Sequence, residues 1–156
     1  MQHTYQTNIK WQNTAPLKPF TYTSYSRNHS LHIDGKADLL CSSDVVFRGD
    51  GSRYNPEDFL LASVSSCHML WYLHLCADNG ITVVDYNDTA TGVLQTGANQ
   101  PGKFVAITLH PNVTITEAAH IQLAHELHHK ANTHCFIANT LNLEIKHIVT
   151  INALTK

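Results

Sequence analysis

A long apolar stretch, from Phe59 to Ala77, dominates the hydrophobic pattern of the chain. Asn55 and Pro56 precede it as a suitable N-cap and first helical residue, and Asn79-Gly80 follows as a stop signal. The pattern therefore predicts a helix from about Pro56 to Asp78. A helix that is apolar on nearly all sides belongs in the centre of a fold. The apolar residues spread around most of its circumference and are Leu60, Leu61, Val64, Met69, Leu70, Trp71, Leu73 and Leu75.

Alternating segments on both sides of this helix predict strands. Asp34-Gly35 predicts a hairpin turn between two of the early strands. Thr116 is the expected cap of a second helix, Glu117–Ala131, and Asn132 or Thr133 that of a short third helix, Cys135–Leu141. We see no repeat or linker and predict a single domain over residues 1–156 of class α+β, with helices on a mainly antiparallel sheet. The expected strands are Tyr5–Trp11, Tyr22–Ser26, His29–Ile33, Ala37–Cys41, Ile81–Leu94, Phe104–Ile115 and Leu143–Ile151.

Composition narrows the classes of function. The net charge of −2 gives no electrostatic reason to expect nucleic acid or an anionic membrane as a partner. Serines and histidines interrupt the apolar stretch and argue against a membrane span. The first ten residues lack the apolar core of a signal peptide, so we expect a cytoplasmic protein. Charged residues make up only 14% of the chain, which favours burial of surface in an oligomer.

The four cysteines at positions 41, 67, 76 and 135 form no CxxC pair. Burial as a small apolar side chain is the common fate of a free cysteine, and we assign that role to Cys41 and Cys76. Cys67 follows Ser65 and Ser66, which could bend or interrupt the helix by bonding to backbone carbonyls. A thiol at the start of a new helical segment would have its thiolate stabilised by unpaired N–H groups. Cys135, after Thr133, is the second candidate for that setting.

Two motifs surround the candidate cysteines. One is Asn55-Pro56-Glu57 with Ala62, followed by Ser66-Cys67-His68-Met69, and the other runs from His129-Lys130-Ala131 through Cys135 to Asn139. They are similar to the helix that ends in a cysteine, and to the segment with the second cysteine, of the OsmC/Ohr superfamily. The order of elements agrees over nearly the whole chain. Two segments, Tyr25-Ser26-Arg27 with His29 and Cys67-His68-Met69-Leu70-Trp71, resemble an OsmC-like subgroup rather than the best-studied OsmC or Ohr branches.

The resemblance implies a thiol-dependent peroxidase that acts on organic hydroperoxides. Cys67 would attack the peroxide, become a sulfenic acid and condense with Cys135 to a disulfide. An external dithiol, for example a lipoyl-type compound, would reduce this disulfide. No other cofactor and no metal is expected. Glu57 matches the family glutamate, although its place at a helix start would justify it without catalysis. Arg27 is our candidate for the family arginine, and Arg48 and Arg53 are its rivals.

The resemblance also implies an intertwined homodimer with its active sites at the subunit interface, where Arg27 acts within its own chain or across the dimer. We expect a preference for bulky organic hydroperoxides over hydrogen peroxide. The apolar residues around Cys67 suggest an apolar pocket; they are Phe59, Met69, Leu70 and Trp71.

One motif points elsewhere. Residues 125–129 match H-E-x-x-H, in which His125 and His129 would bind zinc and Glu126 would act as general base. A third ligand is needed, and the longer metzincin pattern has Gly and His where this chain has Asn132 and Cys135. We therefore favour an amphipathic helix with histidines on its solvent face over a zinc hydrolase. A non-catalytic binding protein of the same fold is the remaining alternative.

Overall fold

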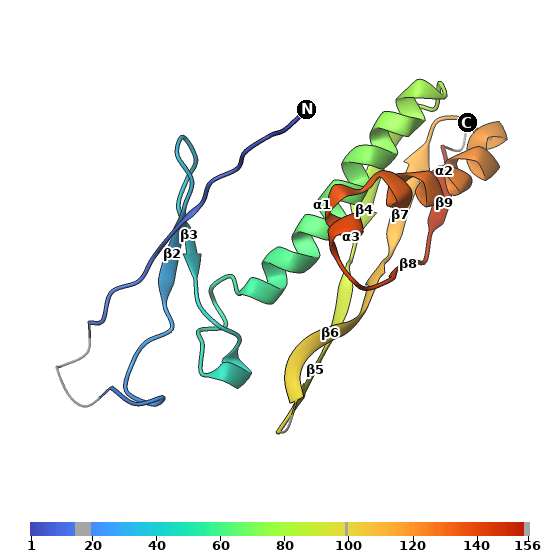
Figure 1. Ribbon diagram of the computed structural model, residues 1–156. Helices are drawn as coiled ribbons and strands as arrows, with labels where there is room; N and C mark the ends of the chain where they lie inside the picture. Colours follow the sequence, from blue (N-terminus) through green and yellow to red (C-terminus); the bar gives the residue numbers. More distant parts are fainter. Residues whose placement is uncertain (15–19, 99, 155–156) are drawn as a thin grey trace. The chain divides into compact units, whose positions relative to one another are not determined.

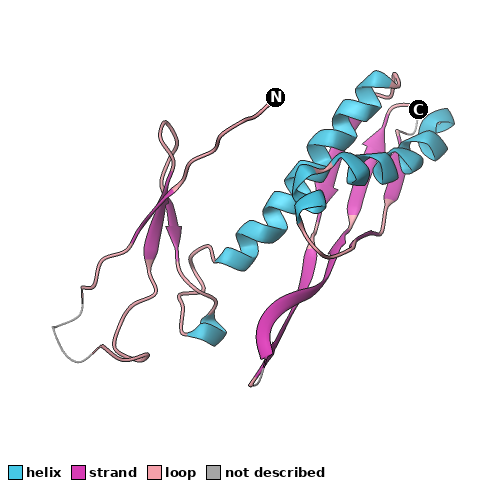
Figure 2. Cartoon of the chain, viewed as in Figure 1, coloured by secondary structure: helices cyan, strands magenta, loops and turns pink. Residues whose placement is uncertain are grey.

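The computed structural model describes residues 1–14, 20–98 and 100–154. The chain forms two compact units, Met1–Phe59 and Leu60–Lys156, called unit 1 and unit 2 below. Figure 1 shows the elements of each unit, and Figure 2 shows their helices and strands. The predicted single domain over residues 1–156 stays a prediction that this division does not test.

Unit 1 contains a small antiparallel sheet in the order β1-β2-β3. Its strands are β1 (Asn8–Lys10), β2 (His29–His32) and β3 (Leu39–Cys41). Gly35 has a φ of 74° between β2 and β3, a conformation that glycine adopts without steric cost, as the hairpin prediction requires. The predicted strand Tyr22–Ser26 is wrong, because turns and bends occupy these residues. A short 3-10 helix, η1 (Val45–Phe47), follows.

Reciprocal hydrogen bonds fix the start of helix α1 (Pro56–Asp78). The side chain of Asn55 accepts a bond of 2.8 Å from the Asp58 backbone N–H, and the Asp58 carboxylate accepts one of 3.0 Å from the Asn55 N–H. This pairing satisfies two backbone donors that a helix start leaves unpaired. The predicted cap and helix bounds are confirmed.

Helix α1 buries only one stripe of its surface in the single chain. Its fully buried residues are Val64, His68, Tyr72 and Cys76, each four positions from the next. Leu70, on another face, is 60% exposed. By length and hydropathy α1 could also cross a membrane, but one such helix is weak evidence, since core helices of soluble proteins meet the same criteria. Its predicted position in the centre of the fold is therefore not established by the single chain.

Unit 2 contains two three-stranded sheets, ordered β4-β7-β9 and β5-β6-β8. The three long strands predicted for this region each divide into two, and the halves lie in different sheets. β4 pairs antiparallel with β7 and β5 antiparallel with β6, whereas β8 and β9 pair parallel. The strands are β4 (Val83–Asp88), β5 (Thr91–Gly97), β6 (Gln100–Leu109), β7 (Pro111–Ile115), β8 (Ile145–His147) and β9 (Thr150–Ala153).

The carboxylate of Asp88 accounts for the break between β4 and β5 and for the break between β6 and β7. Asp88, the last residue of β4, accepts a bond of 2.6 Å from the backbone N–H of His110, which separates β6 from β7. The other carboxylate oxygen accepts a bond of 2.5 Å from the Ser65 hydroxyl of α1. Asp88 thus ties both bends to the helix. The α+β class and the antiparallel-rich sheets are as predicted.

The second and third helices begin later than predicted. A 3-10 turn, η2 (Ala118–His120), precedes α2 (Ile121–His134), and α3 (Phe136–Thr140) has Cys135 itself as its N-cap. Thr133 is not a cap, since it belongs to α2 and its hydroxyl bonds to the carbonyl of His129.

Two hydrophobic clusters form the core of unit 2. One joins α1, β7 and α2, and Figure 1 shows these helices lying over the face of β4, β7 and β9. The other joins Val64 of α1 to β6 and β8. The core thus holds α1, which contains Cys67, against α2, which ends at Cys135.

Candidate functional site

Cys67 lies in the middle of an uninterrupted helix. The expected break at the serine pair is wrong, because α1 is continuous from Pro56 to Asp78. Ser65 binds the Asp88 carboxylate, so its hydroxyl does not compete for the helix backbone. Cys67 therefore has no helix N-terminus beneath it. It is a free, half-buried thiol, which leaves it accessible to a small reactant.

Cys135 occupies the junction of α2 and α3. Its backbone N–H donates to the carbonyl of Asn132, and its sulfur accepts a bond of 3.4 Å from the backbone N–H of Ala138. The sulfur is thus at a helix N-terminus, as predicted, although α3 has only five residues. Unlike Cys67, this thiol is fully buried.

Burial outweighs the helix terminus in setting the acidity of Cys135. Loss of solvation, together with the hydrogen bond and repulsion from Cys67, raises the pKa of the Cys135 thiol to about 11. The N–H groups of Ala138 and Ile137 act in the opposite direction but less strongly. The expectation of a stabilised thiolate at Cys135 is therefore wrong for the free chain, and this sulfur stays protonated at neutral pH.

The fold brings Cys67 and Cys135 together. Their thiols lie close enough for Cys67 to contribute to the raised pKa of Cys135, although the residues are 135 − 67 = 68 positions apart in the sequence. Both are free thiols in this structure. An accessible thiol in contact with a buried, protonated one can form a disulfide after the first has been oxidised.

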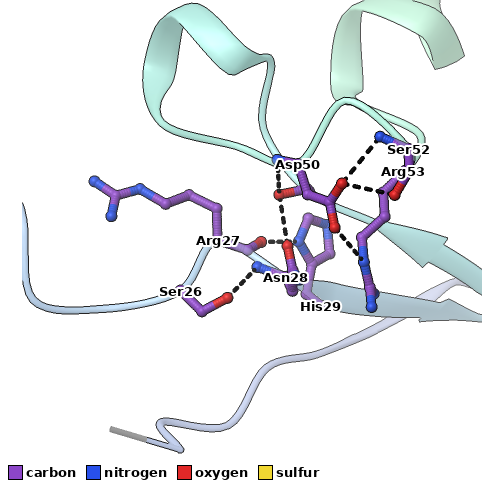
Figure 3. Close-up of polar contacts among 8 residues, drawn as sticks. Ser26, Arg27, Asn28, His29, Asp50, Ser52 and Arg53 are labelled. Carbon is purple, nitrogen blue, oxygen red and sulfur yellow. Dashed lines mark hydrogen bonds and ion pairs between the residues drawn. The ribbon is translucent and has the colours of Figure 1, made fainter.

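Arg27 lies in unit 1, and aromatic residues and carbonyls surround its guanidinium group. It donates hydrogen bonds to the carbonyls of Tyr25 and Tyr22, and lies 4.0 Å from the ring centroid of Tyr25 and 4.6 Å from that of Tyr22. Figure 3 shows its side chain extending away from Asp50 and Arg53. Stacking of this kind holds a guanidinium in place while it keeps its charge.

Glu57, the predicted partner of Arg27, forms no ion pair with it among the described residues. One carboxylate oxygen of Glu57 is buried without a hydrogen-bond partner in the single chain. Of the rival arginines, Arg53 pairs with Asp50 at 3.3 Å (Figure 3), as expected for a residue that serves its loop. Arg48 ends η1 with a φ of 69°. The predicted Arg27–Glu57 pair is therefore absent from unit 1 of the single chain.

An aromatic cavity lies beside Arg27 in unit 1. Its volume is about 410 Å³, and Trp11, Phe20, Tyr25, Arg27 and Pro56 are among its lining residues. The rings of Phe20 and Tyr25 stack with centroids 4.7 Å apart, and Trp11 meets both edge-on. Such a cavity can hold an apolar group next to a fixed positive charge.

A polar network supports this part of unit 1. The Ser42 hydroxyl donates to the Asn28 side chain at 2.9 Å and accepts from the Asp50 backbone N–H at 3.1 Å. In Figure 3, Asn28 lies between Arg27 and His29, next to the Asp50 loop. The network thus joins β2 to the loop that leads into α1.

The remaining cysteines are buried, in agreement with the structural role predicted for them. The Cys41 thiol donates to the carbonyl of Leu39. Burial raises the pKa of the Cys76 thiol. Neither of these thiols is placed for attack on a solute.

The five residues of the H-E-x-x-H stretch lie on two faces of α2, and the three functional residues of the motif are on the exposed face. His125, Glu126 and His129 are exposed. Within residues 1–14, 20–98 and 100–154, no three His, Cys, Asp or Glu side chains form a group that could hold a metal ion. The histidine that sequence analysis missed is His128, which is buried and bonds through Nδ1 to Nε2 of His68 at 2.9 Å. The only signal in the sequence was the spacing of His68, which is four residues from Val64 and four from Tyr72 and so shares a helix face with them.

The chain belongs to the OsmC-like protein family, whose sequence model matches residues 49–150. No curated protein matches the sequence significantly. Among solved structures, an OsmC-like protein of unknown function from Vibrio cholerae is 27% identical, with a TM-score of 0.85 over 95% of this chain and 99% of the other.

Two further structures share the fold at lower identity. One is an organic hydroperoxide resistance protein from Elizabethkingia anophelis, 18% identical, with a TM-score of 0.69 over 99% of this chain and 100% of the other. The second, from Vibrio cholerae, is a putative organic hydroperoxide resistance protein with captopril bound in one of its active sites. It is 21% identical, with a TM-score of 0.64 over 99% of this chain and 96% of the other.

Proposed function

We propose that this protein is a thiol-dependent peroxidase that reduces organic hydroperoxides with Cys67 and Cys135. The observation that carries the proposal is the proximity of these two free thiols, which come from distant parts of the sequence. The names of two structural relatives, which are organic hydroperoxide resistance proteins, point to the same class of reaction.

The difference in burial assigns the two roles. Cys67 is half-buried and accessible, so its thiolate attacks the distal oxygen of the hydroperoxide ROOH. The O–O bond breaks, the leaving alkoxide takes the proton that the Cys67 thiol gave up and departs as ROH, and Cys67 becomes a sulfenic acid. The Cys135 sulfur then attacks the Cys67 sulfur, the Cys135 proton passes to the leaving hydroxide, water departs and a disulfide forms. An external dithiol restores both thiols and is itself oxidised to a disulfide.

The cavity in unit 1 supports a preference for organic hydroperoxides over hydrogen peroxide. Its aromatic lining gives an apolar group a binding surface, and hydrogen peroxide has none to place there. We propose an intertwined homodimer in which Arg27 polarises the peroxide and stabilises the Cys67 thiolate. Glu57, whose buried oxygen lacks a partner in the single chain, would orient Arg27 there.

Chemical trapping of the sulfenic acid tests the assignment of roles. Cys67→Ser and Cys135→Ser receive one equivalent of cumene hydroperoxide and dimedone, and the label is mapped by mass spectrometry. Cys135→Ser should reduce the peroxide once and carry the label on Cys67, because it cannot close the disulfide. Cys67→Ser should carry no label and show no turnover.

Cys76→Ser is the matched control, since Cys76 lies on the same helix but is buried against the core. It should form the Cys67–Cys135 disulfide as the native protein does. Label on Cys135 in Cys67→Ser, at the native rate, would reverse the roles. The absence of peroxide consumption by the folded native protein would leave the non-catalytic binding protein as the correct alternative.

A further inference from the structure

A second cavity lies in unit 2, and the proposed peroxidase does not use it. Its volume is about 960 Å³, and its lining comes from α2 and from the segment Glu144–Val149, with Thr108 of β6. Neither reactive cysteine is among its lining residues. The cavity is therefore a separate place where a ligand can bind.

Three buried polar atoms of the lining lack a hydrogen-bond partner in this structure. They are Nε2 of His128, Nε2 of His147 and Oδ1 of Asn132. The side chain of His128 is also almost completely buried, at 3% exposure. Unsatisfied buried polar atoms cost free energy, so several of them on one cavity indicate a ligand that satisfies them.

His128 is oriented as a metal-binding histidine usually is. Its Nδ1 is held by Nε2 of His68 at 2.9 Å, and its ring stacks on Tyr72 with centroids 3.8 Å apart. His147 in turn lies against His68, with ring centroids 4.5 Å apart. When Nδ1–H of His128 donates to His68, the Nε2 lone pair is free, and an outer partner on one ring nitrogen commonly fixes the other as the metal ligand.

The charges around the cavity do not favour an anion. Two lysines and two glutamates line it, and their formal charges cancel. The lining also offers the uncharged amide of Asn132 and the imidazole rings of His128 and His147. Neutral imidazole is a donor that zinc, copper, nickel and cobalt ions accept readily.

We infer that this cavity binds a divalent transition-metal ion through Nε2 of His128, Nε2 of His147 and Oδ1 of Asn132. Three His, Cys, Asp or Glu ligands are not assembled among the described residues, so the set consists of two nitrogens, an amide oxygen and water. The volume of the cavity leaves room for that water. The exposed histidines of the H-E-x-x-H motif, His125 and His129, line the same cavity but are not among the proposed ligands. The inference does not depend on the proposed peroxidase.

Cobalt binding tests this inference with a readout that is independent of activity. Untagged protein carrying Cys67→Ser and Cys135→Ser, which removes the competing thiols, is freed of metal and titrated with Co²⁺ by calorimetry and absorbance. We expect one ion per chain without a sulfur-to-cobalt charge-transfer band. His147→Ala should weaken binding more than about 100-fold, and His68→Gln by about 10- to 100-fold as the loss of an outer partner.

The double variant His125→Ala/His129→Ala is the matched control and should bind Co²⁺ as the parent does. His147 is half-buried, and circular dichroism and sedimentation check that His147→Ala stays folded. His128→Gln gives a second, independent loss of a nitrogen ligand. No binding by the folded parent overturns the inference. Binding that survives His147→Ala and His128→Gln but is lost in the His125→Ala/His129→Ala control would place the metal on the exposed motif. That result would also overturn the inference.

Discussion

The two units of this protein differ in how they bury their apolar side chains. Among the described residues, nearly all fully buried apolar side chains belong to unit 2, and Cys41 is the exception in unit 1. Large side chains of unit 1 are instead exposed in the single chain, as for Phe20 at 64%, Tyr22 at 60% and Tyr54 at 54%. Hydrogen bonds among Asn28, Ser42 and Asp50 and ring stacking hold unit 1 together, whereas a packed core holds unit 2.

The two units therefore draw their folding free energy from different sources. Burial of apolar surface is the main favourable contribution to folding, and unit 1 obtains little of it alone. Exposed apolar surface of this extent is typical of a region that binds other protein surface. We therefore expect unit 2 to depend on its own packing and unit 1 to depend on assembly. The following predictions test that expectation.

The largest expected effect is on the core of unit 2. Leu127→Ala removes a fully buried side chain of α2 and should lower the free energy of unfolding by about 2–5 kcal/mol. Ile121→Ala on the same helix is the control, because Ile121 is 37% exposed, and should cost clearly less. Denaturant unfolding measures both. Equal losses would mean that α2 is not packed as this structure shows.

Acid should destabilise unit 2 through its buried histidines. The pKa values of His68 and His128 are lowered to about 3, mainly by burial, so the unfolded chain takes up protons first as the pH falls. The stability is complete above about pH 6.5 and decreases from there toward pH 3. The two residues together should cost roughly 2 kcal/mol between pH 6.5 and 5.5.

Unfolding curves at a series of pH values measure this loss. The double variant His68→Gln/His128→Gln lacks both titrating groups, and its stability should depend less on pH over the same range. An unchanged pH dependence would show that these histidines are not held neutral in the folded protein.

The aromatic surface of unit 1 tests the dependence on assembly. Trp11→Ala, at a residue 44% exposed in the single chain, should raise the dissociation constant of the homodimer about 30-fold, the effect of losing an interface residue worth about 2 kcal/mol. Tyr5→Ala is the control, because Tyr5 lies outside the ring cluster of Trp11, Phe20 and Tyr25. Sedimentation over a concentration series measures both. A stable monomer of the native protein at micromolar concentration contradicts the homodimer itself.

The smallest effect concerns the start of α1. Asn55→Ala removes the side chain that accepts from the Asp58 N–H and should cost about 1 kcal/mol of unfolding free energy. Asn55→Asp keeps an acceptor at the same position and should be close to neutral. Thermal and denaturant unfolding compare the two. A loss shared equally by both variants would assign the effect to something other than the cap.

Sequence determined the features that depend on neighbouring residues. The bounds of α1 followed from Asn55, Pro56 and Asn79-Gly80 because a cap and a stop signal act within one helical turn. The turn at Asp34-Gly35 followed for the same reason. The α+β class came from the order of these local patterns, and the cysteine pair came from two short motifs. None of these required knowledge of which segments meet.

Tertiary structure alone decided the features that depend on distant residues. Asp88 bends two strands that the hydrophobic pattern had shown as continuous, because its partners Ser65 and His110 come from elsewhere in the chain. The same holds for the proximity of Cys67 and Cys135 and for the hydrogen bond between His68 and His128. Burial then reversed the expected acidity of Cys135. Solvation and long-range contacts are set by the packed fold, and no local pattern of residues encodes them.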